Sequence, residues 1–159
     1  MAITKISAEV VSIAEHCKDT KSFVLRPEAK VDYKAGQFVM VNIPYKDTFV
    51  RRAYSIASKE KDGTIELCLN YIEKGLASKF FFELKGGENM LIDGPYGIFK
   101  LRKSTHDKLF ICTGTGVAPL RAMIYELLSE GAKEDITLVF GERTEEELLY
   151  RLEFEALQK

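Results

Sequence analysis

The sequence predicts an antiparallel β-barrel followed by a smaller parallel α/β unit. Residues 1–100 form short stretches rich in β-branched and aromatic residues, separated by turn signals. After residues 101–107 the pattern changes to an apolar strand, a helix, a second apolar strand and a second helix, which is typical of parallel pairing. We therefore divide the 159-residue chain into an expected barrel domain, 1–103, and an expected α/β domain, 104–159.

Six strands are expected in the first domain, and their short spacing favours an antiparallel barrel over an open parallel sheet. Turn signals occur at Lys34-Ala35-Gly36, Lys61-Asp62-Gly63 and Gly86-Gly87. One helix is expected over 77–84 (ASKFFFEL), and we assign its apolar side chains to the core. The strands are expected over 7–16, 21–27, 37–44, 51–58, 64–72 and 88–94.

The second domain is expected to contain strands over 108–114 and 135–141 and helices over 118–131 and 144–159. Because both strands are apolar throughout, we expect both faces of their sheet to be covered. Two strands are fewer than the roughly five or six of a usual doubly wound domain. The prediction is therefore a truncated domain whose exposed sheet edge favours self-association.

Composition and charge exclude several classes of function. A net charge of −1 argues against nucleic acid or an anionic membrane surface as the main partner. There is no apolar run of the roughly 20 residues that a spanning helix needs and no secretory h-region, so we expect a cytoplasmic protein without a membrane span. The three cysteines form no metal-binding cluster and are expected to be reduced thiols. His16 and His106 are expected to be ordinary surface residues.

The segment CTGTGVAPLRAMI, 112–124, is the strongest local signal. It follows an apolar strand and begins a helix, which is where a phosphate-binding turn lies. Gly114 and Gly116 permit close approach of the backbone to an anion, and Pro119 suits the first helical turn. The alternative is a strand–helix turn in which the glycines serve only the backbone.

A second candidate anion site is YIEKGLASKFF, 71–81. Gly75 frees the loop, and the N–H groups at the start of the following helix would point at a ligand. The alternative is that Ser78 is an N-terminal capping residue.

The strand RRAYSIAS, 51–58, combines two arginines, a tyrosine and a serine. With a period of two, Arg52 and Tyr54 lie on one face, whereas Arg51 and Ser55 lie on the other. An arginine can clamp a diphosphate, a tyrosine can cover a flat ring and a hydroxyl can bind a ring nitrogen. The group favours a dinucleotide with a planar redox ring; the alternative is an edge strand with exposed arginines.

Four motifs occur in order along the chain, namely RAYS, GLAS, GPYG and GTGVAP, together with ELCLNYI and FGERTEEELLYRLEFEAL. In this order and at these spacings the chain resembles the ferredoxin–NADP reductase superfamily over essentially its whole length. The resemblance implies a six-stranded Greek-key flavin barrel with one helix, followed by the beginning of a Rossmann-like NAD(P)-binding domain.

The resemblance also implies roles for the strand residues. Arg52 would bind the FAD diphosphate, Tyr54 would pack on the isoalloxazine ring, and Ser55 would hydrogen-bond near the reactive N5, with Ala53 beside them. Tyr54 and Ser55 are thus the residues expected at the reacting atoms.

Three further segments are implied to contact the cofactors FAD and NAD(P)H. One strand would line the flavin, one loop would hold the FAD diphosphate, and one turn would hold the diphosphate of NAD(P)H. In that order they are Leu69, Asn70 and Tyr71; Gly75, Leu76, Ala77 and Ser78; and Gly114, Thr115, Gly116, Val117, Ala118 and Pro119.

The family transfers a hydride between NAD(P)H and flavin and passes electrons to an acceptor. The resemblance implies a separate acceptor here, either a ferredoxin-like protein or a small molecule. Two alternatives are a flavin-binding electron-transfer subunit without nicotinamide turnover and a non-catalytic interaction module. The sequence leaves NADH and NADPH both open.

Overall fold

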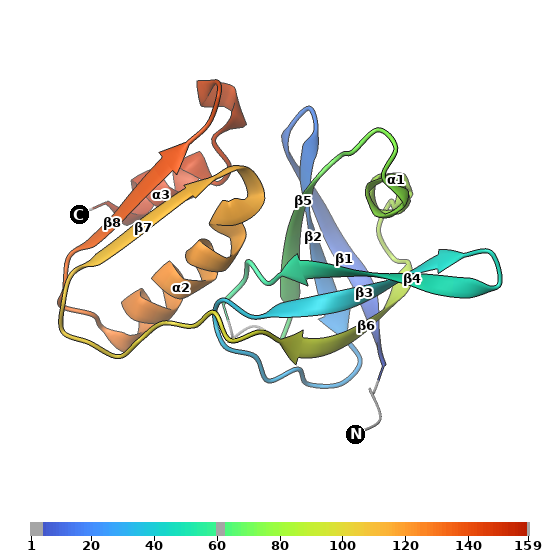
Figure 1. Ribbon diagram of the computed structural model, residues 1–159, viewed down its shortest axis with the longest axis horizontal. Coiled ribbons are helices and arrows are strands. Elements are labelled where there is room, and N and C mark those ends of the chain that lie inside the picture. Colours follow the sequence, from blue (N-terminus) through green and yellow to red (C-terminus); the bar gives the residue numbers. More distant parts are fainter. Residues whose placement is uncertain (1–4, 60–62, 159) are drawn as a thin grey trace.

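The computed structural model of the chain describes residues 5–59 and 63–158. Six strands in these residues form one antiparallel sheet, in the order β4-β3-β6-β1-β2-β5 (Figure 1). Strand β6 returns to lie between β3 and β1, which is a Greek-key connection. The strands are β1 Ile6–Cys17, β2 Thr20–Pro27, β3 Phe38–Tyr45, β4 Thr48–Ser55, β5 Ile65–Asn70 and β6 Asn89–Tyr96.

Alternation of side chains along these strands builds the barrel interior. In β3, Val39, Val41 and Ile43 are fully buried, as the two-residue period of a strand requires. An antiparallel bridge between Ile56, just after β4, and Leu67 of β5 joins the two outer strands of the sheet. The predicted antiparallel barrel is confirmed. Residues 61 and 62 of one predicted turn lie outside the described residues.

Helix α1, Leu76–Glu83, packs against the barrel core and confirms the helix predicted over 77–84 to within one residue. Phe81 is fully buried, and its ring lies 5.0 Å from that of Phe23 and 5.1 Å from that of Tyr54, measured between centroids. Phe80 and Phe82 pack more loosely on the same core. The phenylalanine run therefore joins the helix to the barrel, as predicted.

The α/β half consists of β7 Lys108–Thr113, α2 Val117–Glu130, β8 Ile136–Gly141 and α3 Arg151–Leu157. Strands β7 and β8 pair in parallel, with Lys108 opposite Ile136. Helix α2 ends at Gly131, whose left-handed φ of 74° suits a residue without a side chain. The predicted strand–helix–strand order is confirmed.

The expectation that both faces of this sheet are covered is wrong for the described residues. Helices α2 and α3 pack on the face that carries Phe110 and Leu138. On the other face Leu109, Ile111 and Val139 are 63%, 68% and 50% exposed. The strands are apolar on both faces, but the described chain supplies helices to only one of them.

The single helix predicted over 144–159 is also wrong. Residues Glu145–Glu147 form a short 3₁₀ turn, η3, and α3 begins only at Arg151. Between them Tyr150 adopts a left-handed φ of 57°. This bend buries Leu149 and Tyr150 against the barrel, and tertiary packing thus overrides the local preference for one helix.

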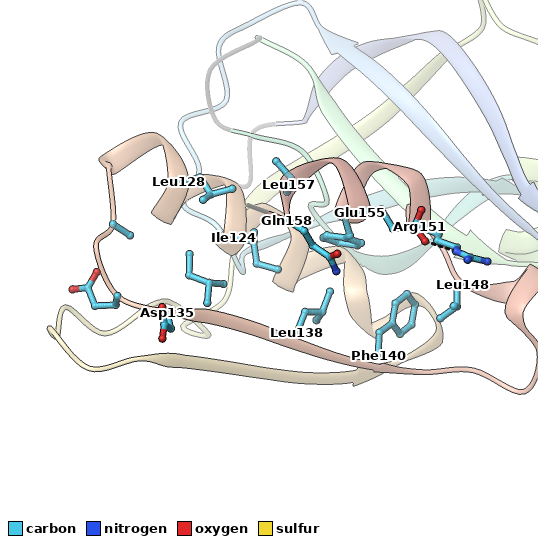
Figure 2. Close-up of a pocket in the computed structure, with 14 residues that line it drawn as sticks. Ile124, Leu128, Asp135, Leu138, Phe140, Leu148, Arg151, Glu155, Leu157 and Gln158 are labelled. Carbon is cyan, nitrogen blue, oxygen red and sulfur yellow. Dashed lines mark hydrogen bonds and ion pairs between the residues drawn. The ribbon is translucent and has the colours of Figure 1, made fainter.

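A cavity of about 760 Å³ lies within the α/β half, bounded by α2, β8 and α3 (Figure 2). Apolar and charged side chains line it together, among them Leu138, Phe140 and Arg151. None of the predicted cofactor-binding residues lines this cavity.

No helix in the described part of the chain is both long and apolar enough to cross a membrane. The described residues also contain no group of three or more His, Cys, Asp or Glu side chains placed to hold a metal ion.

Candidate functional site

A cavity of about 750 Å³ lies where the end of β4, the end of β5 and the start of α1 meet the α/β half. Cofactor sites typically occupy about 300–1,000 Å³, so its size suits an extended ligand. It brings together segments as far apart in the sequence as Ser55 and Thr115. Its lining includes Arg52, Ala53, Tyr54, Ser55, Cys68, Leu69, Asn70, Tyr71, Ile72, Lys74, Gly75, Leu76, Ala77, Ser78, Thr115 and Ala118.

Strand β4 contributes the residues expected to hold a diphosphate and a ring. Arg52 is exposed at the cavity, and its Nη1 donates to the backbone oxygen of Arg51 at 2.9 Å. Ser55 is half-buried in the wall. Arg51 is absent from this lining and pairs with Asp93 instead. The structure thus places Arg52 at the cavity and turns Arg51 away from it, as the strand period predicts.

Tyr54 presents a flat ring at the same wall. It is half-buried, and its ring meets that of Phe81 edge-on at 74°. Burial raises the pKa of its hydroxyl, and the nearby charge of Arg52 opposes this shift. The Tyr54 hydroxyl is therefore uncharged, and the ring is held in place by its packing on Phe81. Both properties suit a surface on which a flat ligand ring stacks.

The end of β5 forms another part of the cavity wall. Leu69 is buried, whereas Asn70 and Tyr71 are exposed. The Oδ1 of Asn70 accepts a hydrogen bond from the Thr20 hydroxyl at 2.9 Å. The Tyr71 ring lies 5.1 Å from that of Phe82 in α1. These contacts hold the side chains of the strand end in place beside the cavity.

The loop before α1 is ordered by the buried hydroxyl of Ser78. This hydroxyl accepts from the Ile72 N–H at 3.0 Å and lies 2.9 Å from the Ile72 oxygen and 3.1 Å from the Gly75 oxygen. A Cβ on Gly75 would lie 2.7 Å from the Ser78 Oγ, so a side chain there would displace the loop.

The capping alternative for Ser78 is wrong, because the residue at the N-cap is Gly75 and Ser78 lies inside the helix. The first N–H groups of any α-helix lack intrahelical partners, and those of α1 begin at the cavity wall. The structure thus assigns Ser78 to loop geometry.

The glycine turn between β7 and α2 reaches the cavity only in part. Thr115 and Ala118 line it, while Gly114, with φ of 54°, lines an adjoining cavity of about 280 Å³ together with Asn70. Val117 is fully buried, so its side chain faces the core. Gly116 and Pro119 line neither of these cavities.

The expectation that His16 is an ordinary surface residue is wrong. Its ring packs 4.4 Å from that of Tyr150, and its Nε2 is buried without a hydrogen-bond partner in the described residues. Burial lowers the pKa of His16, and the charge of Arg121 acts in the same direction against Glu66 and Glu153. His106, in contrast, is exposed as predicted. His16 as a whole is half-buried, and the Tyr150 ring packs against it.

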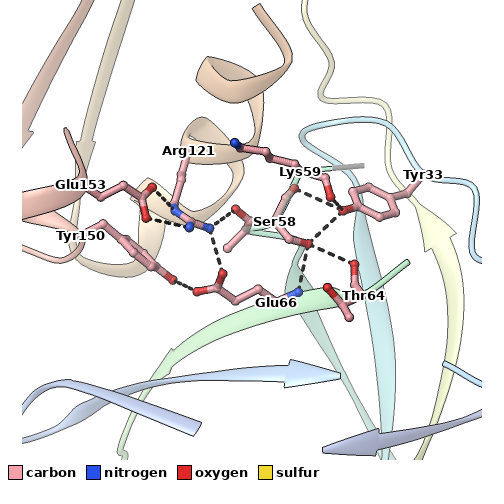
Figure 3. A network of polar contacts seen from close by, with 9 residues as sticks. Tyr33, Ser58, Lys59, Thr64, Glu66, Arg121, Tyr150 and Glu153 are labelled. Carbon is pink, nitrogen blue, oxygen red and sulfur yellow. Dashed lines mark hydrogen bonds and ion pairs between the residues drawn. The ribbon is translucent and has the colours of Figure 1, made fainter. Parts of the chain in front are cut away.

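An ionic cluster beside the cavity joins the two halves of the molecule (Figure 3). Arg121 of α2 donates to Glu66 of β5 at 2.9 Å, to the Ala57 oxygen at 2.7 Å and to both carboxylate oxygens of Glu153 at 2.6 and 2.8 Å. The Tyr150 hydroxyl donates to the second oxygen of Glu66 at 2.8 Å. Sequence reasoning missed this cluster. The only signal was one arginine inside the apolar segment 117–127.

Burial and pairing act against each other at Glu153. Burial alone would raise the pKa of its carboxyl group, but hydrogen bonds from Arg121 and Tyr125 outweigh it and lower that pKa.

Burial raises the pKa of the Cys68 thiol to about 12, so this cavity-lining cysteine is a neutral thiol at physiological pH.

Comparison with known families gives two matches. Residues 7–101 match the oxidoreductase FAD-binding domain, and residues 110–159 match the oxidoreductase NAD-binding domain. The first match alone covers more than half of the chain. The two matched segments correspond to the barrel and to the α/β half.

Individual relatives agree with these matches. The chain is 35% identical to ferredoxin–NADP reductase B of Sorangium cellulosum, over 100% of this chain and 63% of that protein. It is 34% identical to the phenol hydroxylase P5 protein of Acinetobacter pittii, over 96% of this chain and 43% of that protein. The chain therefore spans less than two thirds of the length of these relatives.

A solved structure agrees as well. The ferredoxin NADP⁺ reductase from Neisseria gonorrhoeae, with bound FAD and NADP, superposes with a TM-score of 0.86 at 25% identity, over 96% of this chain and 63% of that one. Together with the barrel, the parallel α/β half and the two domain matches, these relatives show that the chain belongs to the ferredoxin reductase-type oxidoreductases, with an FAD-binding domain and part of an NAD-binding domain.

Proposed function

We propose that this chain binds FAD in the 750 Å³ cavity and takes part in hydride transfer between NAD(P)H and the flavin, with electrons passing to a separate acceptor. One observation carries the proposal. The cavity gathers the strand that the sequence predicts for a diphosphate and a planar ring, the loop that it predicts for an anion, and part of the turn that it predicts for a phosphate.

The residues around the cavity fit FAD. Arg52 and the backbone N–H groups at the start of α1 would bind the diphosphate, because both present positive charge or dipole to an anion. The Tyr54 ring would cover one face of the isoalloxazine, and the Ser55 hydroxyl would hydrogen-bond near its reactive nitrogen. Bound FAD would supply two-electron and one-electron redox chemistry that no side chain here provides.

The turn from Gly114 to Pro119 would hold the diphosphate of NAD(P)H. Its place in the wall, through Thr115 and Ala118, supports a nicotinamide ring directed at the flavin. With this turn on one side and β4 on the other, the protein orients the two dinucleotides and needs no side-chain base.

The electron acceptor that we propose is a ferredoxin-like protein or a small molecule. The name of the Sorangium relative, ferredoxin–NADP reductase B, supports a ferredoxin-type acceptor.

The three cysteines are free, in keeping with a cytoplasmic location, which stays a prediction. We place the domain boundary between residues 103 and 104, in the loop between β6 and β7.

The test is a titration of the purified chain with FAD, followed by anaerobic mixing with NADH or NADPH. We expect the bound flavin spectrum to appear at one FAD per chain and then to bleach on addition of the nicotinamide. A chain that binds no FAD would overturn the proposal.

A second candidate is a flavin-binding electron-transfer unit without nicotinamide turnover of its own. The uncovered face of the β7–β8 sheet favours it, because the described α/β half offers few contacts for the remote part of a dinucleotide. Remote contacts help to hold a reacting ring in place, and we therefore expect slow reduction by NAD(P)H. Fast, saturable bleaching would exclude this second candidate.

A further inference from the structure

Arg121 is the residue that physically joins the two sides of the cavity. Its guanidinium bonds to β5 through Glu66, to the segment after β4 through the Ala57 oxygen, and to α3 through Glu153 (Figure 3). Its own backbone lies in α2, directly after the glycine turn. One side chain of α2 thus connects to two neighbouring segments of the barrel and to α3.

The anchor points of Arg121 lie next to cavity residues on both sides. Ala57 follows Ser55 by two residues, and Glu66 precedes the cavity-lining Cys68 by two. On the other side, Arg121 follows the cavity-lining Ala118 by three residues within one turn of α2. Any movement between Arg121 and its barrel partners therefore changes the width of the cavity.

Geometry and burial make this connection stiff. The Arg121 side chain is 12% exposed and that of Glu66 is 14% exposed. The Arg121 guanidinium lies 5.3 Å from the Tyr125 ring centre and 4.4 Å from that of Tyr150. A planar guanidinium held by two carboxylates, a carbonyl and two rings has one favourable orientation, because each partner fixes a different direction.

We propose that Arg121 is a positioning residue that fixes the distance and orientation between the flavin-binding barrel and the nicotinamide-binding turn. The proposal rests on the function proposed above and adds the residue that sets its geometry. Arg121 itself lines none of the cavity. It acts through α2 on one side and through the ends of β4 and β5 on the other.

The kinetic test compares Arg121→Gln and Glu66→Gln with the parent chain, all loaded with FAD. Because FAD would lie on the barrel alone, its dissociation constant should change by less than about twofold. The limiting rate of flavin reduction at saturating NAD(P)H should fall by about tenfold or more, since small misplacements of reacting groups have effects of this order. Arg121→Lys should be reduced faster than Arg121→Gln but more slowly than the parent. Lysine keeps the positive charge but lacks the planar guanidinium that binds several acceptors at once.

A matched control separates this effect from the loss of any surface ion pair. Arg26 is 61% exposed and pairs with Glu9 between two barrel strands. Arg26→Gln should leave both the FAD affinity and the limiting rate unchanged. Parental limiting rates in both Arg121→Gln and Glu66→Gln would overturn the proposal.

A second measurement does not depend on cofactors and distinguishes failure of this proposal from failure of the proposed function. Residual dipolar couplings of backbone N–H groups report the relative orientation of the two halves. The parent should fit one alignment tensor, whereas Arg121→Gln and Glu66→Gln should need separate tensors for the barrel and the α/β half. A single tensor for the folded variants would overturn the proposal even if the parent reduced flavin rapidly.

Discussion

The guanidinium of Arg51 donates to the fully buried carboxylate of Asp93, two strands away across β3, while its neighbour Arg52 remains at the cavity. Asp93 also accepts from Asn42 Nδ2 at 2.8 Å and from the Tyr96 hydroxyl at 2.7 Å. Two adjacent arginines therefore have different tasks. One completes a buried polar network, and the other is available to a ligand.

Arg52→Ala should weaken FAD binding by about 1.5–3 kcal/mol, because it removes a charge-assisted contact with the diphosphate. Thermal stability should hardly change, since Arg52 is exposed and, within the described residues, its side chain donates to the backbone oxygen of its neighbour Arg51. Fluorescence titration with FAD measures the affinity. Equal affinity in the variant and the parent would contradict the assignment of Arg52 to the diphosphate.

Arg51→Ala should have the opposite profile, with lower stability and little change in FAD affinity. Burial by itself raises the pKa of Asp93, but hydrogen bonds from Asn42, Tyr96 and Arg51 outweigh it and lower that pKa below its ordinary 3.8. The ionised carboxylate thus stabilises the fold above pH 3.8, and this stability is lost as the pH falls through the folded-state pKa. Without Arg51 the acid-unfolding midpoint should move to higher pH in circular dichroism. An unchanged midpoint would show that Arg51 contributes little to the network.

Tyr54→Ala should expose one face of the bound flavin and increase its fluorescence, because a stacked tyrosine quenches the ring. Tyr54→Phe keeps the packing on Phe81 but lacks the readily oxidised phenol, so its emission should also rise while the FAD affinity stays close to that of the parent. Tyr45→Ala is a suitable control, since Tyr45 is 43% exposed and lies outside the cavity lining. Tyr33, although another tyrosine of the barrel, is 3% exposed and would report on folding instead. Identical flavin emission in parent and Tyr54→Ala would place the ring elsewhere.

His16→Phe should flatten the pH dependence of stability. The folded-state pKa of His16 is lowered from 6.5, chiefly by burial, so the unfolded chain binds a proton more readily. Stability should therefore fall as the pH decreases below about 6.5 and level off below the folded-state pKa. Urea unfolding between pH 5 and 7, about the unperturbed pKa of histidine, measures this slope. His106→Gln is the control: His106 is exposed, so this variant should keep the parental change of unfolding free energy with pH. If His16→Phe also kept it, the pH dependence would belong to another group.

Ile111→Lys should reduce self-association of the chain. Ile111, Leu109 and Val139 form an exposed apolar face on the β7–β8 sheet, and apolar patches of this kind pair with other surfaces. Loss of one buried isoleucine contact should weaken association by about tenfold or more. Sedimentation equilibrium measures the association constant, and Leu152→Lys on exposed α3 is the control. A parent that stays monomeric at high concentration would contradict the prediction.

The sequence by itself determined the order of elements and the chemistry of the cavity walls. The two-residue alternation in β3 and β4 needs only local information, because side chains of a strand point to opposite faces wherever the strand lies. It therefore predicted that Arg52 and Arg51 face opposite ways. Gly75 and Gly114 likewise indicated turns, because the backbone conformation of a turn depends on the local sequence. Ordered motifs along the chain supplied the family.

Only the tertiary structure decided which residues lie at the junction of the two halves. Tyr150 leaves the helical pattern because its ring is buried between His16 and Arg121 and its hydroxyl reaches Glu66. The two barrel partners, His16 and Glu66, lie 84 or more positions before Tyr150 in the sequence. No local periodicity encodes a contact over such a distance. The burial of His16 and the central place of Arg121 follow from the same contact. Both depend on the free energy of packing the α/β half against the barrel. Local sequence patterns carry no information about that packing.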